Sequence, residues 1–350
     1  LKHIGHSMKL SEFDYDLPEE LIAQKPLPER DASRMLVVHR STQSWRDSSF
    51  SEFPLQLNPD DVVVVNNSRV IPARLQGQRK ESGGRVEVFL VRELEPQVWQ
   101  ALVRPSARLR RGSRAVFGNQ QLEAEFLDEP GGELRTVRFE SQESFETALS
   151  KVGSTPLPPY IKRPEGVSLA DDERYQTIYS KQRGAIAAPT AGLHFTPELF
   201  ARVRSTNQLV EITLHVGYGT FEPVRVDNVN EHQVSSERYE ISTSAAERIN
   251  SVREHGGRVV AVGTTTTRAL ESSTNGGKVT AGFGEASLTI KPGYKFNVVD
   301  ALLTNFHLPC SSLLILVSVF AGRELILNAY SHAVMQRYRF YSYGDCMLIL

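Results

Sequence analysis

The sequence predicts an α/β fold in which a small antiparallel β-barrel domain is inserted into a layered α/β main domain. Three observations support this. Four consecutive valines at residues 62–65 are typical of a strand covered on both faces. From about Arg74 to Glu140 the pattern changes to short apolar/polar alternations. After Asp171, helical and strand-like segments alternate, which is typical of a layered α/β domain.

The inserted barrel domain is expected at residues 71–151, and the main domain at residues 8–70 and 152–350. A chain of 350 residues agrees with two domains, because single cores stop growing well before about 300 residues. Gly-Gly, Glu-Pro and Pro-Gly-Gly turns separate the alternations, as in a small barrel. The barrel strands are expected at residues 86–91, 98–103, 115–117, 121–126 and 134–139.

The elements of the main domain follow from apolar runs and helix-start signals. The clearest start is Thr196, a good N-cap residue directly before Pro197. Strands are expected at residues 36–39, 61–66, 209–215, 258–262 and 346–350. Helices are expected at residues 144–152, 197–205, 244–255 and, for the most part, 311–337.

Composition excludes several classes of protein. With a net charge of −1, the chain as a whole does not attract nucleic acid, so an RNA site would need a local patch of basic residues. Cys310 and Cys346 lack metal-binding spacing, which argues against structural zinc, an iron–sulfur cluster or a disulfide scaffold. The longest apolar run, residues 313–321, is shorter than the about 20 residues that span a bilayer. We therefore expect a cytoplasmic protein without a metal.

The first seven residues have no apolar signal core. They precede Met8, a plausible native start, so we expect residues 1–7 to be a cloning remnant.

Two glycine-containing segments carry titratable side chains. Residues 187–196 include Thr190, Gly192 and His194, where small residues allow a ligand to approach the backbone and a histidine can move protons. Residues 214–222 place His215, Tyr218 and Glu222 around two glycines. A carboxylate beside an imidazole suits proton abstraction and return. Each segment is equally compatible with an ordinary turn whose polar groups are incidental.

A third segment, residues 261–271, runs from an apolar strand through Gly263 and four threonines into a helix bearing Arg268. Backbone N–H groups at a helix start bind anions, and an arginine can clamp a carboxylate. The alternative is a threonine-rich N-cap.

A fourth group combines residues 304–310 with the aromatic segment 338–345. Its aromatic side chains could stack on a base, although such stripes more often belong to a core.

Basic residues gather at Arg104, Arg108, Arg110, Arg111 and Arg114, with no acidic residue in the stretch. Lys162 and Arg163 follow where the chain returns from the barrel. A local patch of this kind is what a phosphate backbone requires, and a hairpin edge guarded by charge is the alternative.

In combination, these segments resemble the S-adenosylmethionine:tRNA ribosyltransferase-isomerase family of queuosine biosynthesis. The resemblance covers essentially the whole chain after Met8. The most specific matches are Ala188-Pro-Thr-Ala-Gly-Leu-His-Phe195, His215-Val-Gly-Tyr-Gly-Thr-Phe221 and Thr304-Asn-Phe-His-Leu-Pro309. Further matches lie at residues 8–24, 65–74, 156–161, 174–179 and 338–345.

The resemblance implies that the ribosyl part of S-adenosylmethionine is transferred to 7-aminomethyl-7-deazaguanine at the tRNA wobble position and isomerised. Epoxyqueuosine-tRNA forms, adenine and methionine leave, and S-adenosylmethionine is a consumed substrate, so no cofactor is expected. No membrane or protein partner is implied.

Such chemistry needs a base beside the sulfonium, an acid for the departing adenine and a neutral substrate amine. We expect His194 and His215 to transfer protons, with Glu222 orienting or sharing that role. Arg268 and the Gly263–Thr266 turn would hold the methionine carboxylate. The further expected substrate contacts are Thr190, Gly217, Tyr218, Thr264, Phe306, His307 and Tyr343. The expected RNA contacts are Arg104, Arg108, Arg110, Arg111, Lys162 and Arg163.

Two other functions would use the same residues differently. An RNA methyltransferase should have a glycine-rich first strand-turn-helix and an acidic end to its second strand, and neither is found in the first half. A non-catalytic RNA-binding barrel protein would keep its RNA affinity after loss of both histidine loops.

Overall fold

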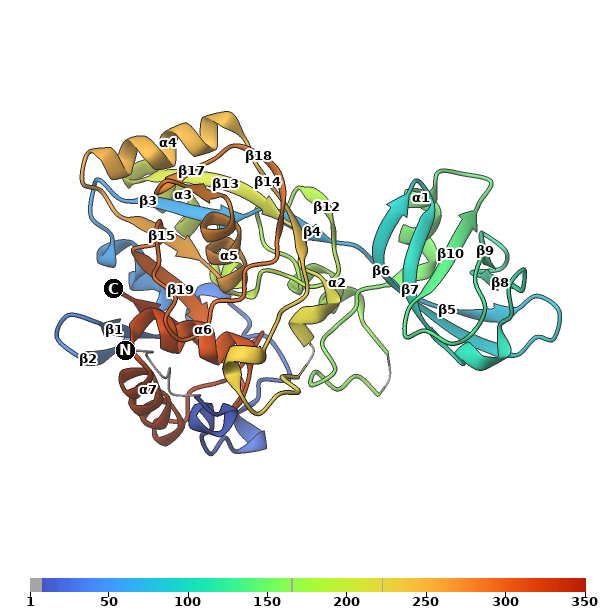
Figure 1. The fold of residues 1–350 in the computed structure, drawn as a ribbon, viewed down its shortest axis with the longest axis horizontal. Coiled ribbons are helices and arrows are strands. Elements are labelled where there is room, and N and C mark those ends of the chain that lie inside the picture. Colours follow the sequence, from blue (N-terminus) through green and yellow to red (C-terminus); the bar gives the residue numbers. More distant parts are fainter. Residues whose placement is uncertain (1–7, 165, 222) are drawn as a thin grey trace, which may run out of the picture.

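The computed structural model describes residues 8–164, 166–221 and 223–350 and contains two extended sheets, one in the body of the molecule and one in a separate lobe (Figure 1). Within these residues the larger sheet has nine strands. In spatial order they are β18 (Gly282–Ala286), β14 (Glu237–Ile241), β13 (Gln208–Leu214), β3 (Val62–Asn66), β15 (Val259–Val262), β19 (Ala301–Asn305), β20 (Cys346–Ile349), β1 (Arg34–His39) and β2 (Ser44–Ser49).

The centre of the large sheet is parallel. Strands β13, β3, β15 and β19 are paired in the same direction, so their carboxyl ends share one edge. Strands β3 and β15 are neighbours at the centre of the sheet. After β3 the next of these parallel strands along the chain is β13, on one side of this pair, and after β15 it is β19, on the other side. In open α/β sheets, ligands bind outside the carboxyl ends at such a topological switch point. The residues that follow β3 and β15 are therefore candidates for a ligand-binding site.

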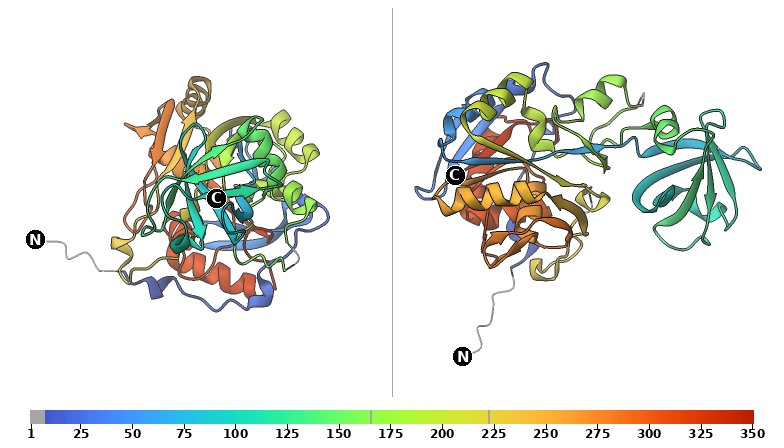
Figure 2. Two further views of the ribbon diagram at one scale, coloured as in Figure 1. Left: turned by 90° about the vertical axis from the view of Figure 1, so that its right-hand side faces the viewer. Right: turned by 90° about the horizontal axis from the view of Figure 1, so that it is seen from above.

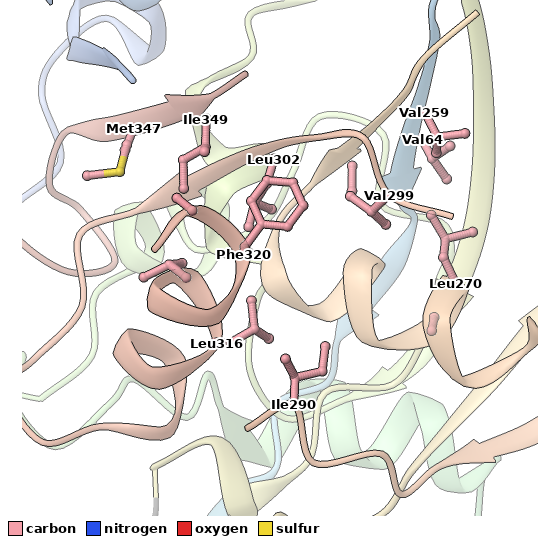
Figure 3. Close-up of a cluster of buried hydrophobic side chains, with 14 of the residues drawn as sticks. Val64, Val259, Leu270, Ile290, Val299, Leu302, Leu316, Phe320, Met347 and Ile349 are labelled. Carbon is pink, nitrogen blue, oxygen red and sulfur yellow. The ribbon is translucent and has the colours of Figure 1, made fainter. Parts of the chain in front are cut away.

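The four valines of β3 explain how the sheet is covered. Val62 and Val64 belong to one buried cluster, and Val63 and Val65 to another, because side chains alternate across a strand. The first cluster is shared with α4 (Thr243–Glu254), α5 (Thr264–Ser272), α6 (Ser312–Ala321) and α7 (Arg323–Met335), and part of it is shown in Figure 3. The second is shared with α3 (Pro197–Thr206). The predicted strand buried on both faces is confirmed.

The smaller sheet closes into an antiparallel barrel, because β8 pairs with both β9 and β5. Its strands are β5 (Arg74–Arg79), β6 (Arg85–Glu95), β7 (Val98–Arg104), β8 (Arg114–Phe117), β9 (Leu122–Phe126) and β10 (Arg135–Glu140), with β11 (Gly153–Ser154) added to β5. At the closure a Cβ on Gly77 would lie 2.3 Å from the Val116 carbonyl oxygen, so only glycine fits. The predicted α/β fold with a small antiparallel barrel is confirmed.

Helix α1 (Phe145–Val152) begins after the N-cap Ser144 and lies beside the barrel (Figure 1). Seen from above, the barrel lobe projects from the body on a few connecting segments (Figure 2). The remaining short elements are α2 (Leu169–Arg174), β4 (Ser68–Val70), β12 (Gln182–Ala185), β16 (Thr274–Asn275) and β17 (Lys278–Val279).

The helical segment expected at residues 311–337 is divided at Gly322, whose φ of 99° lies in the region that glycine favours. Within the described ranges, no single helix is long and apolar enough to cross a bilayer, and α6 and α7 meet that criterion only as a pair bent by 117°.

Candidate active site

Three cavities lie along the carboxyl edge of the parallel strands. The sheet cavity, about 50 Å³, is bordered by Thr190, Gly263, Thr264, Asn305, His307 and Tyr341. The helix cavity, about 180 Å³, is bordered by His232, Arg268, Cys310, Ser312 and Tyr341. The junction cavity, about 450 Å³, lies between the barrel strands β6 and β7 and residues 215–219 and 235–238.

The three cavities share walls. Val216 borders both the sheet cavity and the junction cavity. Tyr341 borders the sheet and helix cavities, and Glu237 borders the helix and junction cavities. The loop after β13 therefore lies where the three cavities meet.

His215 is the first residue after β13 and borders the junction cavity. Its Nδ1 lies 2.8 Å from the Oγ of Ser68, the first residue of β4. Burial, and then the nearby Arg238 charge, lower the pKa of His215, so the ring is neutral near pH 7. Its Nε2 has no hydrogen-bond partner among the described residues. When Nδ1–H donates to Ser68, Nε2 carries a free lone pair and can accept a proton.

The His215 ring also depends on Gly184 in β12. Gly184 has a φ of 146°, and a Cβ there would lie 2.8 Å from His215 Cε1. The pairing of β12 with β4 shifts register at this position, which is a bulge of the kind that redirects neighbouring side chains. Glycine is therefore required beneath the imidazole.

His194 has a different setting. It is buried, its Nδ1 lies 2.7 Å from Ser33 Oγ, and its Nε2 lies 3.2 Å from Asn305 Nδ2. Burial lowers its pKa to about 3, so the ring is neutral and both nitrogens have partners. It borders a separate small cavity with Tyr343 rather than the sheet cavity. The structure does not bring His194 and His215 to one cavity, because the η6 turn (Thr190–His194) directs His194 toward Ser33.

Glu237 connects two of the predicted segments. Its Oε1 accepts a hydrogen bond of 2.9 Å from Gly217 N–H, and its Oε2 pairs with Arg268. The Arg268 guanidinium also donates to the carbonyl oxygens of Ser235 and Ala286. Arg268, expected to clamp a substrate carboxylate, is thus held by partners within the protein. Glu237 could not be recognised from the sequence as a residue of the site, because a single glutamate in a short strand is common.

The helix after Gly263 begins at once, so the four threonines expected in a turn form the first turn of α5. Gly263 precedes α5 with a φ of 94°, and Thr264 borders the sheet cavity. Thr266 and Thr267 donate their hydroxyls to the carbonyl oxygens of Val262 and Gly263, so these hydroxyls are used inside the helix. Thr190 lies across the same cavity.

The predicted contacts Phe306 and His307 are both buried. The Phe306 ring packs against Tyr330, Tyr338 and Phe340, and Phe306 also borders the sheet cavity. His307 borders the sheet cavity, and burial lowers its pKa to about 3.

A pair of tyrosines lines the sheet cavity, and the sequence indicated only one of them, Tyr341, as part of the aromatic segment 338–345. Tyr160 and Tyr341 have ring centroids 4.0 Å apart, and both border that cavity. Tyr341 adopts a φ of 74°, unusual for a bulky residue and frequent at functional sites. Only the fold brings these two residues together.

Tyr218 borders the junction cavity and contacts Phe89 of β6, with ring centroids 5.9 Å apart. Gly217 borders the same cavity. Glu222 lies outside the described residues, so its predicted role stays a prediction.

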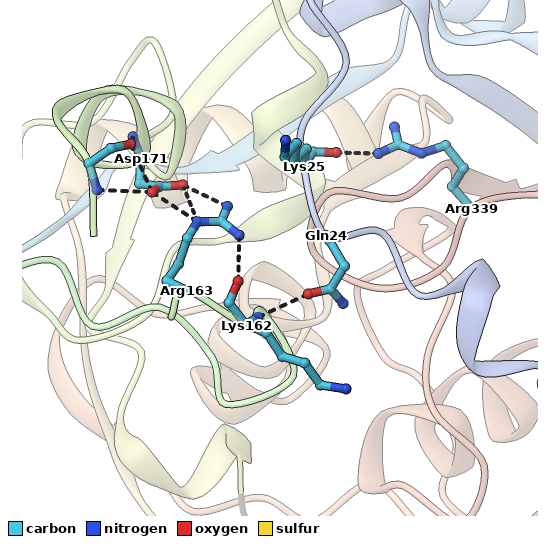
Figure 4. A network of polar contacts seen from close by, with 7 residues as sticks. Gln24, Lys25, Lys162, Arg163, Asp171 and Arg339 are labelled. Atoms are coloured by element: carbon cyan, nitrogen blue, oxygen red, sulfur yellow. Dashed lines mark hydrogen bonds and ion pairs between the residues drawn. The ribbon is translucent and has the colours of Figure 1, made fainter. Parts of the chain in front are cut away.

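The predicted RNA contacts have unequal settings. Arg163 makes a two-pronged ion pair with Asp171, with its Nη2 2.8 Å from Oδ1 (Figure 4). This arginine therefore holds α2 in place, and its guanidinium is already occupied. Lys162 pairs with Glu19 at the surface, where such pairs contribute little. The four remaining residues, Arg104, Arg108, Arg110 and Arg111, are all exposed.

No three His, Cys, Asp or Glu side chains in the described ranges are placed to hold a metal ion. The absence of a cofactor stays a prediction.

A crevice at a topological switch point, lined by an imidazole, hydroxyls and a glycine loop, is typical of the ligand site of an α/β enzyme. Comparison with known proteins agrees. The family model described as "Queuosine biosynthesis protein" matches residues 10–349.

Two relatives are named S-adenosylmethionine:tRNA ribosyltransferase-isomerase. That of Desulforamulus reducens is 48% identical over 345 residues, 98% of this chain and 100% of the relative. That of Pelotomaculum thermopropionicum is 49% identical over the same shares. The crystal structure of S-adenosylmethionine tRNA ribosyltransferase from Thermotoga maritima has 37% identity and a TM-score of 0.56, covering 97% of this chain and 100% of that chain.

The chain therefore belongs to the queuosine biosynthesis protein family, as the motifs predicted. Its enzyme class is that of a transferase-isomerase, also as predicted.

Proposed function

We propose that this enzyme transfers the ribosyl group of S-adenosylmethionine to the aminomethyl group of 7-aminomethyl-7-deazaguanine in tRNA and isomerises it. Adenine and methionine leave, and epoxyqueuosine-tRNA is the product. The observation that supports this most directly is the set of joined cavities around Val216, because a transfer between two substrates needs two adjoining sites. The names of the relatives, which include both S-adenosylmethionine and tRNA, support it independently.

S-adenosylmethionine would lie along the sheet and helix cavities, which share Tyr341 and Leu313. Gly263, Thr264 and Thr190 are the proposed contacts to it in the sheet cavity. The first turn of α5 brings backbone N–H groups to this wall, which suits the carboxylate of the methionine part.

His215 is the proposed proton-transfer residue. His215 borders the junction cavity and is adjacent to Val216, which borders the sheet cavity as well. At this shared wall its neutral ring and unpartnered Nε2 suit removal of the proton from the carbon beside the sulfonium, where the positive sulfur makes that proton acidic. Ser68 orients the ring through Nδ1. We propose that His194 acts as a positioning residue through Asn305, since Asn305 borders the sheet cavity and His194 does not.

The exposed arginines Arg104, Arg108, Arg110 and Arg111 remain the proposed contacts to the tRNA backbone, and Lys162, which is paired with Glu19, is proposed as a weaker contributor. Their exposure supports a role at the surface, where phosphate contacts form.

The test is the product formed when the enzyme is mixed with S-adenosylmethionine and tRNA carrying the modified base. Ribosyl transfer releases free adenine and methionine. S-adenosylhomocysteine would indicate a methyltransferase instead, and the absence of any product with intact tRNA binding would indicate a non-catalytic RNA-binding protein. A His215→Ala variant should release no adenine while still binding tRNA.

A further inference from the structure

The junction cavity has a composition that the other two cavities lack. It takes one wall from the barrel, where Val91, Gln100 and Leu102 lie on β6 and β7. The opposite wall comes from β12, the loop after β13 and β14. A volume of about 450 Å³ falls within the usual range for small-ligand sites.

Both signs of charge are available in this cavity. Arg183 and Arg238 are exposed, and neither forms an ion pair within the described part of the chain. Glu93 and Glu133, on the barrel side, are likewise outside the ion pairs that the structure describes. In contrast, Arg92 is paired with Glu285, and Glu237 with Arg268.

An aromatic ring completes the cavity. Tyr218 is half-buried, borders the junction cavity and is steadied by its contact with Phe89. Leu102 and Val91 add apolar surface across from it. A planar base stacks on such a ring, and phosphates bind unpaired arginines.

We infer that the junction cavity receives the modified nucleotide of the tRNA, with its base against Tyr218 and its flanking phosphates at Arg183 and Arg238. This inference rests on the proposed function and assigns one cavity to one of its two substrates. The aminomethyl group is a cation in water, and Glu93 and Glu133 provide complementary charge. Val216 borders both the sheet cavity and the junction cavity, so the amine meets the ribosyl group where the two cavities adjoin at this residue. His215 is its neighbour in the chain.

The β12 bulge supports the assignment of Arg183. The register shift at Arg183 and Ala185 places Gly184 against the His215 ring. The same local feature thus sets the position of a phosphate-binding arginine and of the proton-transfer histidine. A nucleotide held by Arg183 therefore lies near His215.

Binding measurements test this inference without relying on turnover. The probe is an anticodon stem-loop carrying 7-aminomethyl-7-deazaguanine, compared with the same stem-loop carrying guanine. Titrations at several salt concentrations would use wild type, Arg183→Ala, Tyr218→Ala and Tyr218→Phe. The matched control is Arg202→Ala, an exposed arginine on α3 that borders none of the three cavities.

Arg183→Ala should weaken stem-loop binding about tenfold and reduce the salt slope by about one. Tyr218→Ala should weaken binding at least about tenfold and abolish the preference for the modified base, whereas Tyr218→Phe retains both. Affinity for S-adenosylmethionine should stay at the wild-type value in all variants.

The inference is overturned if Arg183→Ala and Tyr218→Ala bind the stem-loop as Arg202→Ala does. It is also overturned if Tyr218→Ala loses S-adenosylmethionine affinity while keeping RNA affinity, because the junction cavity would then hold the other substrate. Adenine release by the wild-type enzyme tests the proposed function separately. The proposed function and the assignment of the junction cavity can therefore fail independently of each other.

Discussion

Ser68 Oγ lies 2.8 Å from Nδ1 of His215, although the two residues are 147 positions apart in the sequence. Ser68 begins β4, two residues after the end of β3, and His215 directly follows β13. The parallel pairing of β3 with β13 therefore brings the two side chains together. The contact fixes the orientation of an imidazole at the junction cavity whose Nε2 has no hydrogen-bond partner among the described residues.

Removing the Ser68 hydroxyl should therefore impair catalysis more than binding. In Ser68→Ala the imidazole loses the hydrogen-bond partner that orients it through Nδ1, and we expect kcat for adenine release to fall by about tenfold to a hundredfold. Affinities for S-adenosylmethionine and tRNA should stay within about twofold of wild type. Ser205→Ala, on the exposed face of α3, is the matched control. Equal kcat in Ser68→Ala and wild type would contradict this role.

The pH dependence of kcat/KM should report the His215 environment. Burial and the Arg238 charge lower the pKa of His215 from its usual value of about 6.5, so the acid limb of the profile should lie below that pH. A base works when deprotonated, and activity falls as pH drops through this pKa. Arg238→Gln removes one of the two causes and should move the acid limb to higher pH. An unmoved limb would mean that another group controls it.

The buried ion pair of Glu237 and Arg268 should be strongly coupled in stability. Both side chains are at most 10% exposed, so removing one partner leaves a buried charge. Glu237→Gln should lower the free energy of unfolding by about 3–5 kcal/mol, and Glu237→Gln/Arg268→Met should recover part of it. Urea unfolding provides the measurement. Glu254→Gln, which breaks an exposed pair with Lys278, should leave the midpoint unchanged. Additive losses in the double variant would refute the coupling.

Two buried histidines should make the fold sensitive to acid. Burial lowers the pKa of both His194 and His307 to about 3, against about 6.5 in the unfolded chain. The unfolded state then binds more protons between these two values, so stability is complete above about pH 6.5 and is lost as pH falls toward 3. His194→Gln should reduce the slope of unfolding free energy against pH by up to about 1.4 kcal/mol per unit. Unfolding curves between about pH 7 and pH 5 measure it, and an unchanged slope would show that His194 is not protonated on unfolding.

Much of the fold was predictable because local patterns and packing agree. The valine run became β3 with both faces covered, and Thr196 caps α3 by accepting from the Leu199 N–H. The alternations between residues 74 and 140 became the barrel strands. The strands β14 and β18 were not predicted, since residues such as Gly282 and Glu240 give no apolar periodicity.

The site was predictable only in part. His215 and Gly263 lie at the ends of strands, where sequence pattern places them at one edge. Arg268 could not be recognised as an internal partner, because its carboxylate, Glu237, arrives from a different strand. His194 looked like His215 in sequence, and only packing against Ser33 and Asn305 distinguishes the two. Long-range contacts of this kind leave no local signature.

Isotope labels in two parts of S-adenosylmethionine distinguish ribosyl transfer from methyl transfer directly. One preparation carries heavy carbon in the ribose, and another carries it in the methyl group. After reaction with tRNA bearing 7-aminomethyl-7-deazaguanine, nucleosides and small products are analysed by mass spectrometry. Ribosyl transfer predicts ribose label in the modified nucleoside, methyl label in released methionine, and adenine in equal amount. Methyl label in the tRNA, with S-adenosylhomocysteine as the product, would contradict it.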